Sequence, residues 1–203
     1  MIISDAQAVE MYPQDAHWYN KLYLSCVLGY RCGISMIPET GTWIVRPIIN
    51  LDGMSRNAVI AHFEQGTVIE PDLFYCEVFT GRHITMDFVR VDGCWTQQHV
   101  FEGFNTVNNL VQFTKWVQVD YAYAIPDFLH TVTSNHINIE IKGDCIIEVH
   151  LRPNPDPVMY SNFWPVWSET QQPPMPNYKM VADRDNHNNM GRLGFFVPDN
   201  EWA

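Results

Sequence analysis

Positive charge is scarce in this sequence, and no long apolar run is present. The chain has 12 Lys and Arg against 23 Asp and Glu, which gives a formal net charge of −11 at pH 7. Because broad binding to nucleic-acid phosphates needs clustered Lys and Arg, we expect no nucleic-acid partner. No apolar segment approaches membrane-spanning length, and no basic leader precedes an apolar stretch. We therefore expect a cytoplasmic protein with no membrane partner.

Patterns for disulfide frames, structural zinc and covalent hydrolases are also missing. The five cysteines stand at positions 26, 32, 76, 94 and 145, without a Cys-x-x-Cys pair. Their odd number and irregular spacing predict free thiols in a reducing compartment. No Gly-x-Ser-x-Gly elbow and no Cys–His nucleophile pairing stand out, so covalent hydrolase chemistry has no support.

What the chain does have is enough apolar material for a compact fold. Its 203 residues are 46% hydrophobic and 13% aromatic, which argues against disorder for most of the chain. This length suits one domain, or two small lobes around a cleft, with a sizeable core. Hydrophobic periodicity predicts helices at 5–11, 15–30, 107–118 and 126–133, and strands at 43–49, 74–79, 83–91 and 94–101. Residues 168–190 read as a long surface excursion before a closing strand near 193–197.

The most informative segment is 136–152, which reads as a β-hairpin with alternating runs on either side of Lys142-Gly143-Asp144. A three-residue turn separates two faces and sets Asn138 directly across from Glu148, whereas a two-residue Gly143-Asp144 turn would mix them. The three-residue register is therefore expected. Its apolar face would comprise Ile137, Ile139, Ile141, Cys145, Ile147, Val149 and Leu151. Its other face would comprise His136, Asn138, Glu140, Glu148, His150 and Arg152, with Ile146 as the one apolar member.

The polar face of this hairpin has two interpretations. An antiparallel sheet with one side in water is common, and it would make the face simply solvated. However, Glu148, His150 and Arg152 occupy consecutive same-face positions, without the Lys, Thr and Ser usual on solvated faces. This row of carboxylate, imidazole and guanidinium groups is suited to holding metal and phosphate.

Three segments, in order, resemble the ATP-grasp superfamily. Residues 148–153, Glu-Val-His-Leu-Arg-Pro, look like its closing metal-site strand, Glu-x-Asn followed by Arg and Pro. Residues 43–47, Trp-Ile-Val-Arg-Pro, resemble the strand with a phosphate-binding cation, normally Lys, and 50–58 stand where the family has its phosphate-covering loop. Residues 74–88 are similar to the adenine-hinge strand, turn and next strand. The resemblance is to a small, phage-type member, and we expect this chain to be without the domain that usually precedes the fold.

The resemblance implies an α+β fold of two small lobes that hold nucleotide between antiparallel sheets. It divides a single domain, 1–203, into an N-terminal lobe with the phosphate loop (1–73), a hinge and metal-site lobe (74–157) and a C-terminal extension (158–203). It implies ATP as cofactor together with Mg²⁺ or Mn²⁺. The implied metal ligands are Glu148, Asn138 and possibly His150. The implied nucleotide-binding residues are Arg46, Glu77, Val78 and Gly53, and the implied catalytic residues are Arg152 and Arg56.

The departures from the family pattern bear on the metal and the phosphates. His150 replaces the usual Asn, and because magnesium prefers oxygen ligands, an imidazole favours a softer ion such as manganese or a role outside the coordination sphere. Arg46 replaces Lys, which keeps the charge and adds a planar fork suited to phosphate. The covering loop has one glycine, Gly53, where the family has several.

The family's chemistry implies a ligase that works through an acyl phosphate. Such a protein phosphorylates a small-molecule or peptide carboxylate and passes the acyl group to an amine or a thiol. Two alternatives stay open. One is a non-catalytic nucleotide-binding or phage accessory protein in the host cytoplasm that retains the fold. The other is a structural protein whose polar hairpin face is only solvated.

Overall fold

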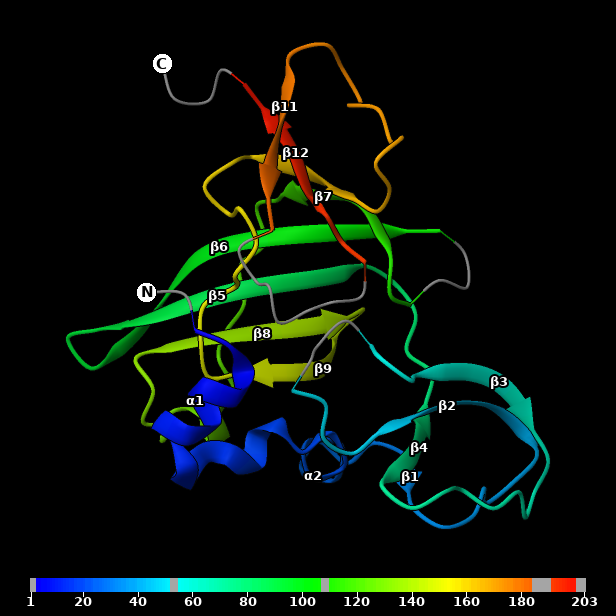
Figure 1. The fold of residues 1–203 in the computed structure, drawn as a ribbon. Helices are drawn as coiled ribbons and strands as arrows, with labels where there is room; N and C mark the ends of the chain where they lie inside the picture. The colour runs from blue at the N-terminus through cyan, green and yellow to red at the C-terminus, as the bar shows by residue number, and fades with distance from the viewer. Residues whose placement is uncertain (1–2, 52–54, 107–109, 184–190, 200–203) are drawn as a thin grey trace.

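The computed structural model describes residues 3–51, 55–106, 110–183 and 191–199. These residues form two antiparallel sheets with a few short helices, as an α+β class predicts. The smaller sheet and the larger sheet lie side by side, and the N-terminal helices pack along the β9 edge of the larger sheet (Figure 1).

The smaller sheet has four strands. In spatial order these are β1 (Cys32–Gly33), β4 (Leu73–Glu77), β2 (Gly41–Pro47) and β3 (Val59–Phe63). Its own core contains Ile37, Trp43, Val45 and Ile69. On β2, Arg46 lies opposite Phe74 of β4, and its guanidinium packs 5.4 Å from the Phe74 ring centroid. The sheet thus presents one buried cation toward the rest of the molecule.

The larger sheet has eight strands. In spatial order these are β11 (Tyr178–Ala182), β12 (Gly194–Pro198), β10 (Asn162–Val166), β7 (Phe113–Gln118), β6 (Cys94–Asn105), β5 (His83–Val91), β8 (His136–Lys142) and β9 (Cys145–His150). β9 is therefore an edge strand, at the side where the helices lie (Figure 1). Residues 162–198 add three strands to the opposite edge.

Short helices cover the exposed edge at β9. α1 (Asp5–Met11) begins with a capping box, in which Ser4 and Gln7 satisfy each other's backbone N–H groups. A 3-10 helix, η1 (Pro13–Tyr19), follows, and α2 (Lys21–Val27) is capped by the Asn20 side chain. A second 3-10 helix, η2, spans Asp127–Leu129. No helix among the described residues is long and apolar enough to cross a membrane.

The turn of the β8–β9 hairpin differs from the prediction. Lys142 pairs with Cys145, so the turn has two residues, Gly143 and Asp144. Gly143 has φ +61°, and a Cβ there would lie 2.5 Å from the Thr80 carbonyl oxygen. The pairing then shifts between Glu140 and Ile141, which marks a β-bulge.

The bulge restores the separation of faces that a two-residue turn alone would lose. Ile141 pairs with Ile146, which is 3% exposed and belongs to the core, so the expectation that Ile146 faces the polar side was wrong. Beyond the bulge Glu140 pairs with Glu148, and Asn138 pairs with His150. The predicted pairing of Asn138 with Glu148 was therefore also wrong. The two-residue turn and the bulge each move β9 along its partner by one residue relative to the predicted register.

Two other predicted elements differ from the structure. Within 107–118, residues 113–118 form strand β7, and 107–109 lie outside the described residues. Pairing of this segment with both β6 and β10 outweighs its helical periodicity. Within 126–133, only the single turn η2 is helical. In the predicted excursion 168–190, Tyr178–Ala182 forms edge strand β11.

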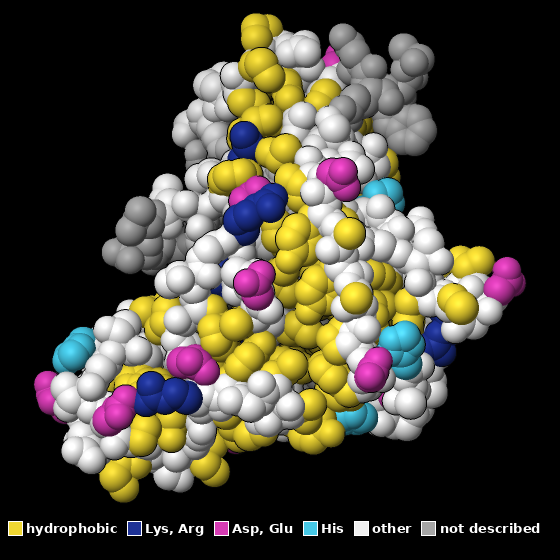
Figure 2. Space-filling model, turned by 180° about the vertical axis from the view of Figure 1, so that it is seen from behind, with side chains coloured by type: hydrophobic (Ala, Val, Ile, Leu, Met, Phe, Trp, Pro, Cys, Tyr) yellow, Lys and Arg dark blue, Asp and Glu magenta, His cyan; other side chains and the backbone are white. Residues whose placement is uncertain are grey.

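The main core lies on one face of the larger sheet. It joins the apolar face of the β8–β9 hairpin to residues of the N-terminal helices, among them Ala8, Trp18 and Leu24. Seen from behind, hydrophobic side chains form a continuous area across the middle of the molecule, and several of the visible Lys and Arg side chains lie next to Asp or Glu (Figure 2). The opposite face of the hairpin faces the smaller sheet.

Candidate functional site

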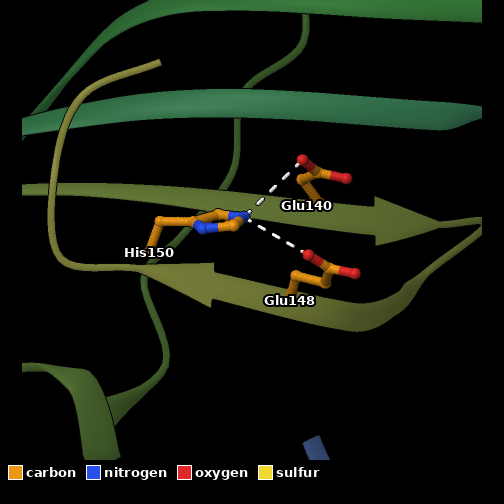
Figure 3. Close-up of side chains that lie close together, drawn as sticks. All are labelled: Glu140, Glu148 and His150. Atoms are coloured by element: carbon orange, nitrogen blue, oxygen red, sulfur yellow. Dashed lines mark ion pairs between the residues drawn. The ribbon is translucent and has the colours of Figure 1, made fainter. Parts of the chain in front are cut away.

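Two carboxylates and an imidazole converge on the polar face of the β8–β9 hairpin. Ligand atoms of Glu140, Glu148 and His150 all lie within 4.8 Å of one another. His150 Nε2 is 3.4 Å from Glu148 Oε2 and 3.7 Å from Glu140 Oε1 (Figure 3). This convergence follows from the β-bulge, which sets Glu140 directly across from Glu148. The three residues are the only such group of three among the described residues.

Glu148 carries a second set of contacts, from cations of two other elements. Lys21, at the start of α2, forms an ion pair with Glu148 Oε1, and Arg46 Nη1 on β2 lies 3.9 Å from the same oxygen. All three side chains are buried. Burial alone would raise the pKa of Glu148, but Lys21, His150 and Arg46 outweigh it and hold the pKa well below its usual range. Glu148 is thus ionised and surrounded by positive charge.

Glu140 is held in a similar way by two imidazoles. His83 Nε2, on β5, is 2.9 Å from Glu140 Oε2, and His150 lies on the other side. Burial would raise the pKa of Glu140, yet hydrogen bonds from His150 and His83 lower it to about 2. Both carboxylates therefore stay charged at neutral pH, which is the state that a metal ion requires.

Asp5, the first residue of α1, fixes the orientation of His150. Asp5 Oδ1 is 3.1 Å from His150 Nδ1, so the ring presents Nε2 to the two glutamates. The pKa of His150 is raised well above its ordinary value, because Asp5, Glu140 and Glu148 outweigh the effect of burial. The ring is therefore an imidazolium at neutral pH, and a metal ion would bind Nε2 only by displacing its proton. A carboxylate that accepts a hydrogen bond from Nδ1–H is a common partner of metal-binding histidines.

Asp5 also binds Arg152. Arg152 Nη2 donates to Asp5 Oδ2 at 2.8 Å, and Arg152 Nε lies 2.8 Å from Asp5 Oδ1 in the same ion pair. The Tyr19 hydroxyl donates to Asp5 Oδ1 at 3.0 Å and accepts from the Leu151 N–H. The pKa of Asp5 is lowered, because His150 and Arg152 outweigh its burial. Arg152 is 6% exposed and firmly held.

Asn138 occupies the next position along the polar row. Its amide nitrogen donates to Thr85 Oγ1 at 2.8 Å and to Asp87 Oδ1 at 3.0 Å. Burial raises the pKa of Asp87, and the Asn154 N–H and Asn138 oppose this. The Asn138 amide oxygen is the atom that would serve as a metal ligand.

Two adjoining cavities lie along this cluster. The first, here called the charged cavity, is lined by Asn138, Glu140, Glu148, His150 and Arg152 together with other residues. The second, here called the apolar cavity, is lined mainly by apolar side chains such as Ile44, Val78 and Ile147, with Arg46 and Glu77. Ser55, His83, Leu110 and Phe113 line both cavities, which therefore adjoin.

The structure brings most of the sequence-predicted residues to these cavities. Glu148, His150, Asn138 and Arg152 line the charged cavity, and Arg46, Glu77 and Val78 line the apolar cavity. Arg46 also donates to the Ile147 carbonyl oxygen at 3.4 Å, so it bridges the two sheets. Arg56 is half-buried and lines neither cavity, and Gly53 lies outside the described residues.

Sequence reasoning did not assign a role to Asp5, Lys21, His83 or Glu140. Glu140 was already on the predicted polar face, and the correct hairpin register would have paired it with Glu148. Asp5 and Lys21 come from the N-terminal helices, which reach the site only by packing around edge strand β9. No local pattern signals such long-range contacts.

The sequence matches no protein-family model and no curated protein. Solved structures do match. N5-carboxyaminoimidazole synthetase from Staphylococcus aureus, complexed with ADP, aligns with 98% of this chain and 74% of its own, with a TM-score of 0.60 at 10% identity. An ATP-grasp superfamily protein from Archaeoglobus fulgidus aligns with 96% of this chain and 66% of its own, with a TM-score of 0.55 at 12% identity.

A third match is carboxyaminoimidazole ribonucleotide synthase from Aspergillus clavatus, complexed with ATP. It covers 95% of this chain and 69% of its own, with a TM-score of 0.52 at 10% identity. The chain thus spans about two thirds to three quarters of the length of these structures. The α+β arrangement predicted from the sequence is confirmed, and the chain has the ATP-grasp fold.

Proposed function

We propose that this protein binds ATP with a divalent metal ion between its two sheets and uses it for ligase chemistry. The γ-phosphoryl group would pass from ATP to a carboxylate, and an amine or thiol would then displace phosphate from the acyl phosphate. The observation that carries the proposal is the adjoining pair of cavities, one charged and one mostly apolar, between Arg46 on one sheet and Glu148 on the other.

The apolar cavity suits an adenine base. Ile44, Val78 and Ile147 offer flat apolar contacts, and ligand pockets usually combine such walls with a few polar groups. Glu77 and Val78 would lie near the adenine and ribose, and Arg46 would bind phosphate through its planar fork. By the resemblance of residues 50–58 to the phosphate-covering loop, Arg56 and Gly53 would also contribute to phosphate binding.

The residues of the charged cavity fit a divalent ion. Two ionised carboxylates and an imidazole nitrogen lie within 4.8 Å of one another, and Asn138 stands beside them. When bound, the ion would neutralise phosphate charge. Because an imidazole is among the ligands, Mn²⁺ suits this set better than Mg²⁺, which prefers oxygen. We propose Glu140, Glu148 and His150 as the ligands, with Asn138 as an additional oxygen donor.

The protein's own contribution to the reaction would be positioning and charge neutralisation. Lys21 and Arg46 balance the charge of Glu148, and Arg46, which lines the apolar cavity, would also bind phosphate oxygens. Arg152 would stabilise the negative charge that develops as the acyl phosphate reacts. The substrates would be small-molecule or peptide carboxylates and amines, in the cytoplasm.

A specific observation favours a second candidate, a nucleotide-binding protein without turnover. The ion pair with Asp5 contacts both Nε and Nη2 of Arg152 and limits its reach toward a substrate. In this candidate the same two cavities would hold nucleotide and metal, and no acyl phosphate would form.

Release of ADP separates the two candidates. The purified protein is incubated with ATP, Mn²⁺ or Mg²⁺ and a panel of carboxylic acids paired with amines and thiols, and ADP is measured. A ligase releases ADP only when a particular acid is present, and hydroxylamine traps its acyl phosphate. Tight nucleotide binding without ADP release from any member of the panel would favour the second candidate.

A further inference from the structure

Two thiols face each other at the end of α2 and the start of β1. Cys26 Sγ and Cys32 Sγ are 3.7 Å apart, Cys26 is exposed and Cys32 is half-buried. The two sulfurs of a disulfide are about 2 Å apart, so closing this pair requires an approach of less than about 2 Å. Neither thiol lines the charged or the apolar cavity.

The backbone holds the two thiols in this position. A left-handed Gly29, with φ +72°, reverses the chain between them, and no atom lies within 4 Å of a Cβ placed there. Arg31, next to Cys32, donates its N–H to Glu77 Oε1 at 2.8 Å and accepts from the Glu77 N–H at 2.9 Å. The start of β1 is thereby anchored, while the exposed end of α2 presents Cys26.

Other roles for these thiols find no support in the geometry. Cys76 lies opposite Cys32 on β4 but is fully buried, out of reach of a reagent in solution. A structural metal site needs more ligands than two, and no group of three close ligands among the described residues includes a cysteine. What remains is a pair of thiols, one of them accessible.

We propose that Cys26 and Cys32 form a reversible disulfide by exchange with a small-molecule disulfide such as oxidised glutathione. The Cys26 thiolate attacks one sulfur of the reagent, which breaks its S–S bond and releases one thiolate. Cys32 then loses its proton to water and attacks Cys26 Sγ, which expels the second thiolate. Two protein thiols are oxidised and one reagent disulfide is reduced to two thiols.

The order of attack follows from the surroundings of the two sulfurs. Burial, together with the neighbouring Cys26, raises the pKa of Cys32 to about 12, so Cys32 stays protonated at neutral pH. The exposed Cys26 is therefore the first to react. Once Cys26 carries the mixed disulfide, the sulfur of Cys32 is already beside it.

Peptide mapping of the folded, full-length protein tests this proposal. After incubation with oxidised glutathione, free thiols are alkylated in acid and the protein is digested with trypsin. Cleavage after Lys21 and Arg31 separates peptide 22–31, which holds Cys26, from the peptide that begins at Cys32. We expect these two peptides joined by a disulfide, an intact mass lower by two hydrogen atoms, and reversal by dithiothreitol.

Matched variants identify the partners. Cys32→Ser should accumulate glutathione on Cys26, because the resolving thiol is gone, whereas Cys94→Ser should form the Cys26–Cys32 bond as the unmodified protein does. Glutathione retained on Cys26 in the unmodified protein, or a link from Cys32 to the peptide 57–82 that holds Cys76, would overturn the proposal. No nucleotide enters this readout, so its failure would not affect the proposed ATP site.

Discussion

The two adjoining cavities are built by opposite means. In the charged cavity, Glu140, Glu148 and His150 are paired with partners from β5, α1, α2 and β2. In the apolar cavity, side chains such as Ile44 and Val78 form most of the wall, and the charged lining residues are Arg46, Glu77 and Lys142. In the charged cavity, a network of ion pairs holds the side chains in place. In the apolar cavity, packing of the apolar side chains sets the shape of the wall. Substitutions in the charged cavity should therefore weaken metal binding, and substitutions in the apolar cavity should weaken binding of the adenine base.

The largest effect is expected from Glu148→Gln. The amide is nearly isosteric but uncharged, so it removes a proposed metal ligand and leaves Lys21 and Arg46 without their shared carboxylate. Metal-dependent nucleotide binding should be abolished, which calorimetric titration with ATP and Mn²⁺ measures. Glu10→Gln, the same charge change at an exposed position of α1, is the matched control and should bind as the unmodified protein does. Unchanged binding in Glu148→Gln would remove Glu148 from the site.

Acid should give the next largest effect, on stability. The folded pKa of Glu140, about 2, lies below its ordinary value of 4.5. Its charge therefore stabilises the fold above pH 4.5, and this stabilisation is lost as the pH falls toward 2.

The contribution of the His150 imidazole to stability changes with pH in the opposite direction. The pKa of His150 is raised above 6.5, so its stabilisation is full below pH 6.5 and is lost as the pH rises through the raised value. The free energy of unfolding, measured with urea at a series of pH values, should be greatest near pH 4.5–6.5. In Glu140→Gln it should fall less steeply below pH 4.5 than in the unmodified protein. An equally steep fall below pH 4.5 in that variant would contradict the lowered pKa of Glu140.

Asp5→Asn should have an intermediate effect that separates positioning from ligation. The amide still accepts a hydrogen bond but loses the charge opposite His150 and Arg152. Loss of such a supporting partner typically weakens metal binding about 10- to 100-fold. Titration of Mn²⁺ measures it, and Tyr19→Phe is the control, because it removes another partner of Asp5 and leaves the His150 contact. Equal affinities in the two variants would mean that Asp5 does not position His150.

The smallest effect is expected in the apolar cavity, from Ile44→Ala. Each buried methylene contributes about 0.8 kcal/mol, and Ile44 is half-buried. ATP affinity should fall about tenfold, or about 1.4 kcal/mol, while Mn²⁺ affinity in the absence of nucleotide stays the same. A loss of metal affinity in this variant would show that the two cavities are not independent.

The polar and apolar faces of the β8–β9 hairpin could be predicted from the sequence because side-chain direction alternates along a strand. Glu148, His150 and Asn138 were found in this way. The pairing was not predictable, because the β-bulge between the turn and Glu148 leaves no composition signal. Together with the two-residue turn, the bulge changed the partner of Glu148 from Asn138 to Glu140.

Contacts made around the edge of the sheet were also beyond prediction. Lys21 lies in a helix with an aromatic stripe that reads as ordinary core, and Asp5 is 145 residues from His150. Strand β7 was taken for helix, because its pairing with two neighbours is not encoded in its own periodicity. The sequence therefore indicated several residues of the candidate site, but it did not indicate their long-range contacts.

The melting temperature of the unmodified protein with ATP and a divalent ion tests the central claim most directly. A ligand that binds only the folded state raises the midpoint by mass action. We predict a clear rise with ATP and Mn²⁺ together, a smaller rise with ATP and Mg²⁺, and little change with ATP and a chelator. No shift with millimolar ATP and either metal would contradict a nucleotide site between the two sheets.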